Sequence, residues 1–116
     1  MAKVQIWHNP RCSKSRQGLA YLQEKNCDIE IFDYLKESID SRVLAGLIEK
    51  SSQPLADFIR TNEPEYRELG LKNKNLSVEE FAAIAAKHPK LLQRPIIIKE
   101  GKVVVARPLS KIDEVL

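Results

Sequence analysis

The pattern of apolar and polar side chains marks four short stretches of the chain as strands, two by alternation and two by short apolar runs. Residues 3–7 (Lys-Val-Gln-Ile-Trp) and residues 29–32 (Ile-Glu-Ile-Phe) repeat with the two-residue period of a half-buried strand. Residues 96–98 are all isoleucine, which suits a buried strand, and residues 103–106 (Val-Val-Val-Ala) follow the turn signal at 100–102 (Glu-Gly-Lys). The pattern predicts two strands near the N-terminus and a hairpin near the C-terminus.

Helical spacing occupies most of the remaining chain. Residues 13–25 place Ser15, Leu19 and Leu22 on one face, and Asn26 is expected to end this helix. The stretch of about 38–92 is predicted to be a helical insertion. Asp40 is the expected N-cap of a helix with Val43, Leu44, Leu47 and Ile48 inward, Pro54 opens a helix to Arg60, and a helix over 64–69 ends at Gly70. Ser77 and Glu80 form a capping box, and the helix that follows places Phe81, Ile84 and Ala85 inward and stops at His88-Pro89. Beyond the insertion and the hairpin, Ser110 is expected to cap a last short helix.

The order of these elements predicts the fold class. A strand, a helix and a strand come first, and a right-handed crossover makes the two strands parallel. The terminal hairpin adds two antiparallel strands. We therefore expect an α/β protein with a thioredoxin-like, mixed four-stranded sheet flanked by helices, and with the helical insertion between the second and third strands. All 116 residues are expected to form one domain.

Composition and charge narrow the function classes. No apolar run reaches the length of a membrane span, and the N-terminus has no apolar signal-peptide region, so we expect a cytoplasmic protein without membrane partners. The formal net charge of +3 arises in the second half of the chain, without a basic run. This excess is too mild for nucleic-acid binding and suits a small anionic substrate better.

The two cysteines are expected to be free thiols. A helix over residues 13–25 would hold Cys12 and Cys27 about 20 Å apart, whereas a disulfide needs Cα atoms within about 7 Å. The chain also has two histidines, but the spacing of the two cysteines and two histidines does not match a zinc site, so no metal is expected. Cys27 lies between a helix and a strand and is interpreted as a structural, buried residue.

Cys12 is the candidate nucleophile. It follows the first predicted strand and precedes the first helix, where unpaired backbone N–H groups favour an anion. Arg11, Lys14 and Arg16 add positive potential. Both effects lower the pKa of a thiol, and the thiolate is the reactive form. The alternative is that Cys12 is a buried apolar side chain without chemistry.

Two neighbours of Cys12 are candidate supporting residues. Ser15 replaces the second cysteine of a Cys-x-x-Cys pair, so an outside thiol must resolve any adduct on Cys12. Its hydroxyl either donates to the thiolate or caps the helix. His8 either lowers the thiol pKa when protonated, or shuttles a proton, or is a partly exposed loop residue.

Three arginines stand at element boundaries. Arg60 ends the predicted helix that starts at Pro54, while Arg94 and Arg107 flank the terminal hairpin and each precede a proline. A guanidinium is always charged and its forked donors match oxyanions. Each arginine alone is equally consistent with a surface charge, but two of them at adjoining strand ends favour an oxyanion site.

Motifs along nearly the whole chain match one known family in order and at compatible spacing. They are His8-Asn9-Pro10-x-Cys12-x-x-Ser15-Arg16, then Arg60, then Glu63-Pro64-x-Tyr66-x-x-Leu69-Gly70-Leu71, then His88-Pro89-x-Leu91-Leu92-x-Arg94-Pro95, and finally Arg107-Pro108. These segments resemble the glutaredoxin-coupled arsenate reductases.

The resemblance implies a mechanism and its partners. Cys12 would attack arsenate, and Arg60, Arg94 and Arg107 would hold the oxyanion. Glutathione, as a co-substrate, would attack the adduct and reduce arsenic to the trivalent state, and glutaredoxin would resolve the mixed disulfide. No bound cofactor is implied. Pro95 matches the cis-proline of the fold, so the resemblance implies a cis Arg94–Pro95 bond.

Two other functions remain open from the sequence. One is a glutathione-linked thiol oxidoreductase with another substrate. The other is a non-enzymatic regulator of the same fold that binds RNA polymerase, although such regulators commonly carry a Cys-x-x-Cys switch, which Ser15 removes here.

Overall fold

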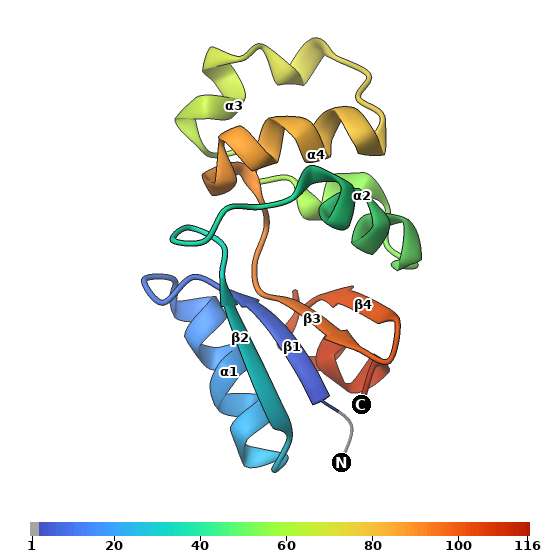
Figure 1. The fold of residues 1–116 in the computed structure, drawn as a ribbon. Coiled ribbons are helices and arrows are strands. Elements are labelled where there is room, and N and C mark those ends of the chain that lie inside the picture. The colour runs from blue at the N-terminus through green and yellow to red at the C-terminus, as the bar shows by residue number, and fades with distance from the viewer. Residues whose placement is uncertain (1–2) are drawn as a thin grey trace.

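The computed structural model contains the predicted mixed sheet. It describes residues 3–116, so the first two residues of the predicted domain lie outside the described part. The strands are β1 (Lys3–His8), β2 (Asp28–Asp33), β3 (Ile96–Lys99) and β4 (Lys102–Val105). They are arranged in the order β2-β1-β3-β4, with β1 and β2 parallel and the other pairs antiparallel (Figure 1). The α/β, thioredoxin-like fold class is thus confirmed.

Helix α1 (Ser13–Glu24) makes the crossover between the two parallel strands. It ends where Asn26 adopts a left-handed φ of 56°. The Asn26 N–H donates to the Gln23 carbonyl and the Cys27 N–H to the Leu22 carbonyl. These two hydrogen bonds form a Schellman motif, which confirms Asn26 as the residue that ends the helix.

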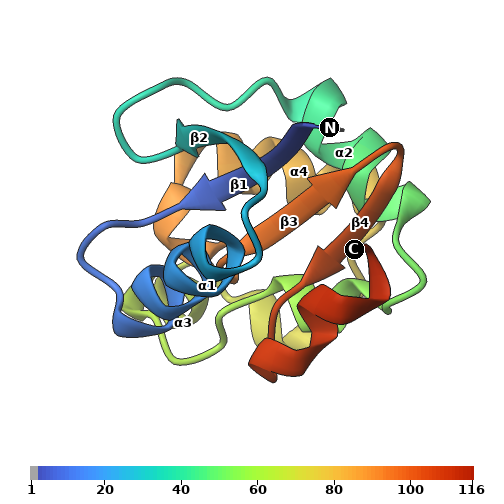
Figure 2. The same ribbon diagram turned by 90° about the horizontal axis from the view of Figure 1, so that it is seen from below.

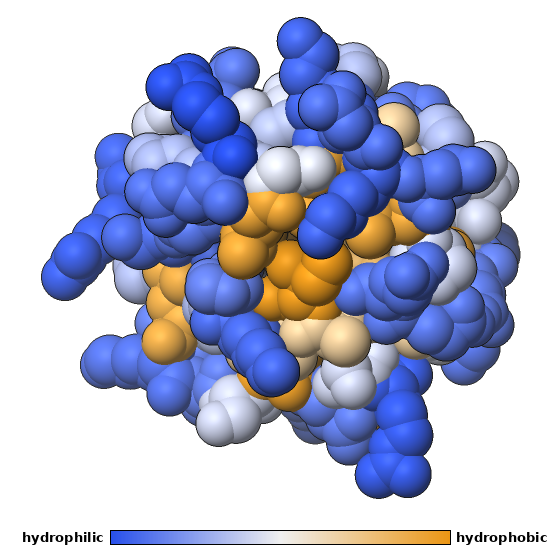
Figure 3. Space-filling model, turned by 90° about the horizontal axis from the view of Figure 1, so that it is seen from above, coloured by the Kyte–Doolittle hydropathy of each residue, from blue (hydrophilic) through white to orange (hydrophobic). Residues whose placement is uncertain are grey.

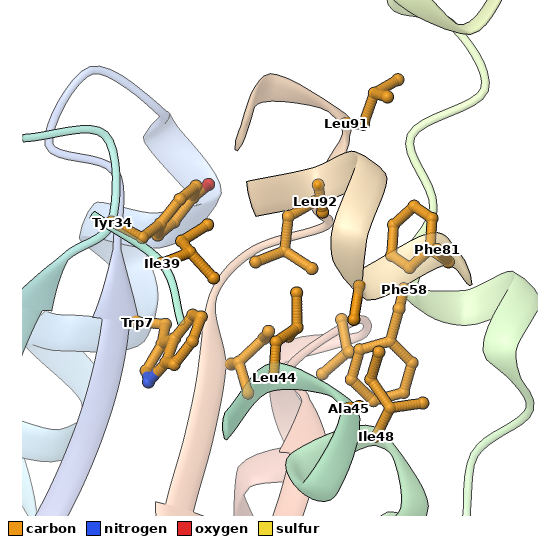
Figure 4. Packing of buried hydrophobic residues seen from close by; sticks show 14 of the residues in the cluster. Trp7, Tyr34, Ile39, Leu44, Ala45, Ile48, Phe58, Phe81, Leu91 and Leu92 are labelled. Carbon is orange, nitrogen blue, oxygen red and sulfur yellow. The ribbon is translucent and has the colours of Figure 1, made fainter. Parts of the chain in front are cut away.

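The two faces of the sheet bury different clusters because side chains alternate along each strand. Ile6, Ile97 and Val104 belong to the cluster that packs against α1 and the C-terminal 3₁₀ helix η4 (Leu109–Glu114). These two helices lie on the same face of the sheet (Figure 2). Trp7 and Ile96 face the opposite way, into the larger cluster below the helical insertion (Figure 4).

The helical insertion lies over this second face of the sheet (Figure 1). Its elements are α2 (Ser41–Lys50), η1 (Leu55–Phe58), α3 (Pro64–Glu68), η2 (Leu71–Asn73), α4 (Val78–Lys87) and η3 (Pro89–Leu91). Asp40 caps α2 by accepting from the Arg42 N–H, and Ser77 and Glu80 form both hydrogen bonds of a capping box. The predicted stops at Gly70 and His88 are also confirmed.

Several details differ from the sequence prediction. Helix η1 ends at Phe58, because Ile59 pairs with Leu92 in an isolated bridge, so Arg60 lies beyond a bridge and does not end a helix. Helix η4 begins after Pro108, with Ser110 inside it, so Ser110 is not the cap.

Three smaller differences concern single side chains. Val43 is 52% exposed, because α2 turns Leu44, Ala45 and Ile48 toward α4. In α4 the fully buried partner of Phe81 and Ala85 is Ala82, and Ile84 is only partly buried. Lys102 belongs to β4, and the two-residue turn consists of Glu100 and Gly101, which both have positive φ.

Candidate active site

The loop between β1 and α1 presents Cys12 at the start of the helix. Cys12 is the N-cap residue of α1, with extended φ and ψ. Its N–H donates to the Asn9 carbonyl and its own carbonyl accepts from the Arg16 N–H, each at 3.0 Å. The Arg16 guanidinium also donates to the Pro10 carbonyl at 2.9 Å. Backbone hydrogen bonds thus fix the position of the cysteine.

The surroundings of Cys12 favour its thiolate. Partial burial of the side chain opposes ionisation, but the Ser15 backbone N–H, the Arg94 guanidinium and the Lys14 backbone N–H outweigh it, so the pKa of the thiol lies below its ordinary value. Backbone N–H groups at a helix N-terminus and a cation are the two standard means of stabilising a thiolate. Cys12 is half-buried and lies at the surface end of α1.

Arg94 and Arg107 reach the thiol from the β3–β4 hairpin, at the edge of the sheet where β1 ends. Nη2 of Arg107 lies 3.9 Å from Sγ of Cys12, and its Nε donates to the Arg94 carbonyl at 3.0 Å. Arg94 is only 8% exposed. It precedes β3 and Arg107 follows β4, and the antiparallel pairing brings these two ends together. Their predicted position at adjoining strand ends is found in the structure.

Arg60 completes a cationic group around Cys12. Burial and then the nearby Arg94 charge lower the pKa of Arg60, while Glu63 and Cys12 act in the opposite direction. Arg60 forms an ion pair with Glu63. Its N–H donates to the Leu91 carbonyl at 2.8 Å, which ties this segment to η3. The fold therefore gathers three arginines from distant segments around one thiol.

His8 and Ser15 form a buried pair below the loop. Nδ1 of His8 lies 2.6 Å from Oγ of Ser15, and the same Oγ accepts from the Asn9 N–H at 2.9 Å. Ser15 makes no side-chain cap, so neither expected role of its hydroxyl matches these contacts. Its hydroxyl instead joins the end of β1 to α1 and holds the loop that carries Cys12.

His8 differs from the sequence interpretation. It ends β1 opposite Asp33 and is only 6% exposed, so it is not a partly exposed loop residue. Burial lowers its pKa; the Asp33 charge opposes that effect and Arg16 adds to it. The imidazole is therefore mostly neutral near pH 7 and adds no cation beside the thiol.

Pro95 connects β3 to helix α1. The Arg94–Pro95 bond is cis, as expected, and the Arg107–Pro108 bond, which the sequence reasoning missed, is cis as well. A Cβ at Gly18 would lie 2.8 Å from Cγ of Pro95. Gly18 therefore permits the close contact between α1 and the Arg94 segment. A glycine within a helical pattern was the available signal for this packing role.

A groove of about 600 Å³ opens beside the Cys12 loop. Pro10 and Arg11 line one part of it, and Lys87, His88 and Lys90 line another. The groove carries several cations and is large enough for a peptide-sized ligand. The sequence reasoning missed it, because the loop and the end of α4 are distant in the chain.

The remaining expectations concern disulfides, metal ligands and membrane spans. Cys12 and Cys27 are both free, as predicted, and Cys27 packs partly buried beneath the sheet. Within residues 3–116 no cluster of three or more His, Cys, Asp or Glu side chains has a metal-holding arrangement. No helix in the same range is long and apolar enough to cross a membrane.

Comparison with known proteins gives a consistent result. The model of the ArsC family matches residues 7–115. A Neisseria meningitidis serogroup B protein named arsenate reductase is 40% identical over the full length of both chains. A Haemophilus influenzae arsenate reductase is 34% identical, covering 97% of this chain and 98% of the relative. The structure of an arsenate reductase from Vibrio cholerae superposes with a TM-score of 0.91 at 34% identity, over 99% of this chain and 98% of that one.

Proposed function

Because this chain belongs to the ArsC family of arsenate reductases, we propose that it reduces arsenate to arsenite through an adduct on Cys12, with glutathione and glutaredoxin as its reductants. The observation that carries this proposal is the position of the Cys12 thiol, at the N-terminus of α1 and 3.9 Å from the Arg107 guanidinium, with Arg94 also lowering its pKa.

The first step of the proposed reaction is substitution at arsenic. The Cys12 thiolate attacks the arsenic atom, a sulfur–arsenic bond forms, and an arsenic–oxygen bond breaks. The departing hydroxide takes a proton from solvent and becomes water, and arsenic stays pentavalent. An anionic substrate and a thiolate repel each other, so the cations Arg60, Arg94 and Arg107 are needed to bring them together and to stabilise the negative charge on the oxygens.

The second step requires an external thiol. Cys27 follows the opposite end of α1 from Cys12, so the chain offers no cysteine that is placed to resolve the adduct. A glutathione thiolate attacks Sγ of Cys12, a sulfur–sulfur bond forms and the sulfur–arsenic bond breaks. The electron pair of that bond stays on arsenic, which leaves as trivalent arsenite. A glutaredoxin thiolate then attacks the glutathione sulfur of the mixed disulfide and releases the Cys12 thiolate.

The groove beside Cys12 supports glutathione as the thiol. Glutathione is a tripeptide with two carboxylates and one ammonium group, and the groove has the size of a small peptide site. Arg11, Lys87 and Lys90 in its lining match the carboxylates, and Asp33 and Glu65 in the same lining match the ammonium group. These reductants are maintained in the cytosol, where thiols stay reduced, so the proposed reaction places the protein in the cytoplasm.

The test is arsenate-dependent oxidation of NADPH, coupled through glutathione, glutathione reductase and glutaredoxin. We expect turnover with the unchanged protein, none with Cys12→Ser, and normal turnover with Cys27→Ser as the matched control. Turnover that survives Cys12→Ser contradicts the assigned nucleophile. If arsenate gives no turnover but the protein, without glutaredoxin, reduces a glutathione mixed disulfide and Cys12→Ser does not, the protein is a thiol oxidoreductase with another substrate. Turnover that needs arsenate but not glutathione contradicts the proposed reductant alone.

A further inference from the structure

Tyr34 is a buried residue with an unused hydrogen-bonding group. Its side chain is 2% exposed, and its ring stacks on Trp7 with centroids 6.3 Å apart. The hydroxyl lies at the end of the ring that points away from Trp7 (Figure 4). Within residues 3–116 this buried hydroxyl finds no hydrogen-bond partner. Leaving such a group unpaired costs about 1–3 kcal/mol, so a protein normally satisfies it.

A second unused donor belongs to Arg94. Nε of Arg94 is buried and is likewise without a partner among the described residues. Arg94 also reaches Cys12, so this unused donor belongs to the oxyanion site. Both groups interact electrostatically with Cys12, so a polar ligand bound at Cys12 would give both donors an acceptor.

The topology explains why Tyr34 lies beside the site. Strands β1 and β2 are parallel, and His8 pairs with Asp33, so the residues that follow both strands emerge at the same edge of the sheet. Asp33 accepts from the N–H groups of Leu35 and Lys36 and fixes the turn that contains Tyr34. Cys12 follows the end of β1, so it lies at the same edge of the sheet as Tyr34.

The electrostatic neighbours of Tyr34 are those of the site. Burial raises the pKa of the Tyr34 hydroxyl well above its ordinary value, and Arg94, Cys12 and Arg60 are among the charges that act on it. The hydroxyl therefore keeps its proton near neutral pH. It is a neutral donor, and arsenate is rich in acceptor oxygens.

We propose that Tyr34 is a further binding residue of the oxyanion site, whose hydroxyl donates a hydrogen bond to a tetrahedral oxyanion held between Cys12 and Arg94. This inference rests on the proposed function, because it requires that an oxyanion binds there. The arginines supply charge, and Tyr34 supplies a rigid, uncharged donor that fixes the orientation of one oxygen.

The test measures arsenate binding without turnover. Cys12→Ser removes the nucleophile and the thiolate charge, so calorimetric titration of this variant with arsenate reports the affinity of the oxyanion site. Adding Tyr34→Phe keeps the ring and removes only the hydroxyl. We expect the dissociation constant for arsenate to rise about tenfold. The matched control is Tyr21→Phe on the Cys12→Ser background, because the Tyr21 hydroxyl binds Asp113 far from the loop. This control should bind arsenate normally.

The stability of the ligand-free protein separates a binding role from a structural one. If the hydroxyl has a hydrogen-bond partner only when a ligand is bound, Tyr34→Phe removes an unpaired buried group from the ligand-free protein. The melting temperature without arsenate then stays the same or rises. A fall in melting temperature together with unchanged arsenate affinity makes the hydroxyl structural and overturns the inference. If Cys12→Ser binds no arsenate, the proposed oxyanion site and this inference both fail. Normal binding by the Tyr34→Phe variant overturns the inference alone.

A measurement without a substitution at Tyr34 provides an independent check. With tyrosine labelled at ¹³Cζ, arsenate added to Cys12→Ser should shift the Tyr34 resonance and leave that of Tyr21 in place. An unmoved Tyr34 resonance at saturating arsenate contradicts the proposed hydrogen bond.

Discussion

The nucleophile and the oxyanion pocket are built in different ways. The loop that holds Cys12 is local: its hydrogen bonds join residues of the segment from His8 to Arg16. The pocket is assembled from three distant segments, because Arg60 follows the Ile59 bridge, Arg94 precedes β3 and Arg107 follows β4. The comparison shows that a short motif positions the thiol, whereas its full activation and its substrate site both need arginines from distant segments.

A third region, the outer surface of the helical insertion, differs from both (Figure 3). Figure 3 looks onto the face formed by the helical insertion and shows apolar surface surrounded by hydrophilic side chains. Leu69, Leu71 and Ile84 line a hollow of about 310 Å³ between α3, η2 and α4. Lys87 and His88 line this hollow as well as the groove beside the Cys12 loop, so the end of α4 separates the apolar hollow from the charged groove.

The largest expected effect comes from the assembled region. Arg94→Ala should lower kcat/KM for arsenate about 100-fold, because it removes a cation from both the oxyanion and the thiolate. Arg42→Ala is the matched control, since the Arg42 side chain is 94% exposed on α2, and it should leave kcat/KM unchanged. Steady-state kinetics at varied arsenate checks this prediction. Normal kinetics with a sharply lower melting temperature would make Arg94 structural.

An intermediate effect is expected at Gly18, where helix α1, which follows Cys12, contacts Pro95 beside Arg94. Gly18→Ala places a Cβ 2.8 Å from Cγ of Pro95, so either α1 or the Arg94 segment must move. Such overpacking costs about 1–3 kcal/mol of unfolding free energy. Gly46→Ala is the control, because nothing lies within 4 Å of its Cβ in α2, and it should stabilise the protein by about 0.5–1 kcal/mol. Urea denaturation measures both, and equal effects would show that α1 does not press on Pro95.

The smallest expected effect concerns the reactivity of the Cys12 thiol itself. The lowered pKa of Cys12 leaves more of it as thiolate near neutral pH, so iodoacetamide should alkylate Cys12 several-fold faster than Cys27. As pH rises, the rate at Cys12 should level off at a lower pH in the folded protein than in the urea-unfolded chain. Arg94→Ala should move that curve to higher pH. Mass spectrometry of the two cysteine peptides gives the rates, and identical profiles for both cysteines would remove the argument for an activated thiolate.

The local features were the ones that the sequence could predict. The capping box at Ser77, the helix end at Asn26 and the turn at Gly101 each depend on neighbouring residues, and all three are present. Strand positions followed from alternation for the same reason. Predictions of element ends were weaker, as at Ser110 and Arg60, because tertiary pairing such as the Ile59–Leu92 bridge decides them.

The site was predictable only in part, for a related reason. Residue types and the resemblance indicated Cys12 and the arginines, but the hydrogen bond between Ser15 and His8 depends on how deeply β1 and α1 bury that pair. The hydroxyl of Tyr34 and the contact of Gly18 with Pro95 depend on packing between segments that the sequence keeps far apart. The sequence indicates which residue types carry reactive or charged groups. It does not show which buried groups lack a hydrogen-bond partner or which side chains are in close contact, because these depend on the folded structure.

The contact between Arg107 and Cys12 spans 95 positions of the chain. During synthesis Cys12 leaves the ribosome well before Arg94 and Arg107. Until the hairpin of β3 and β4 closes against β1, the thiol lacks the Arg94 guanidinium that lowers its pKa. We therefore expect the nascent thiol to react more slowly with oxidants and electrophiles than the thiol of the folded protein.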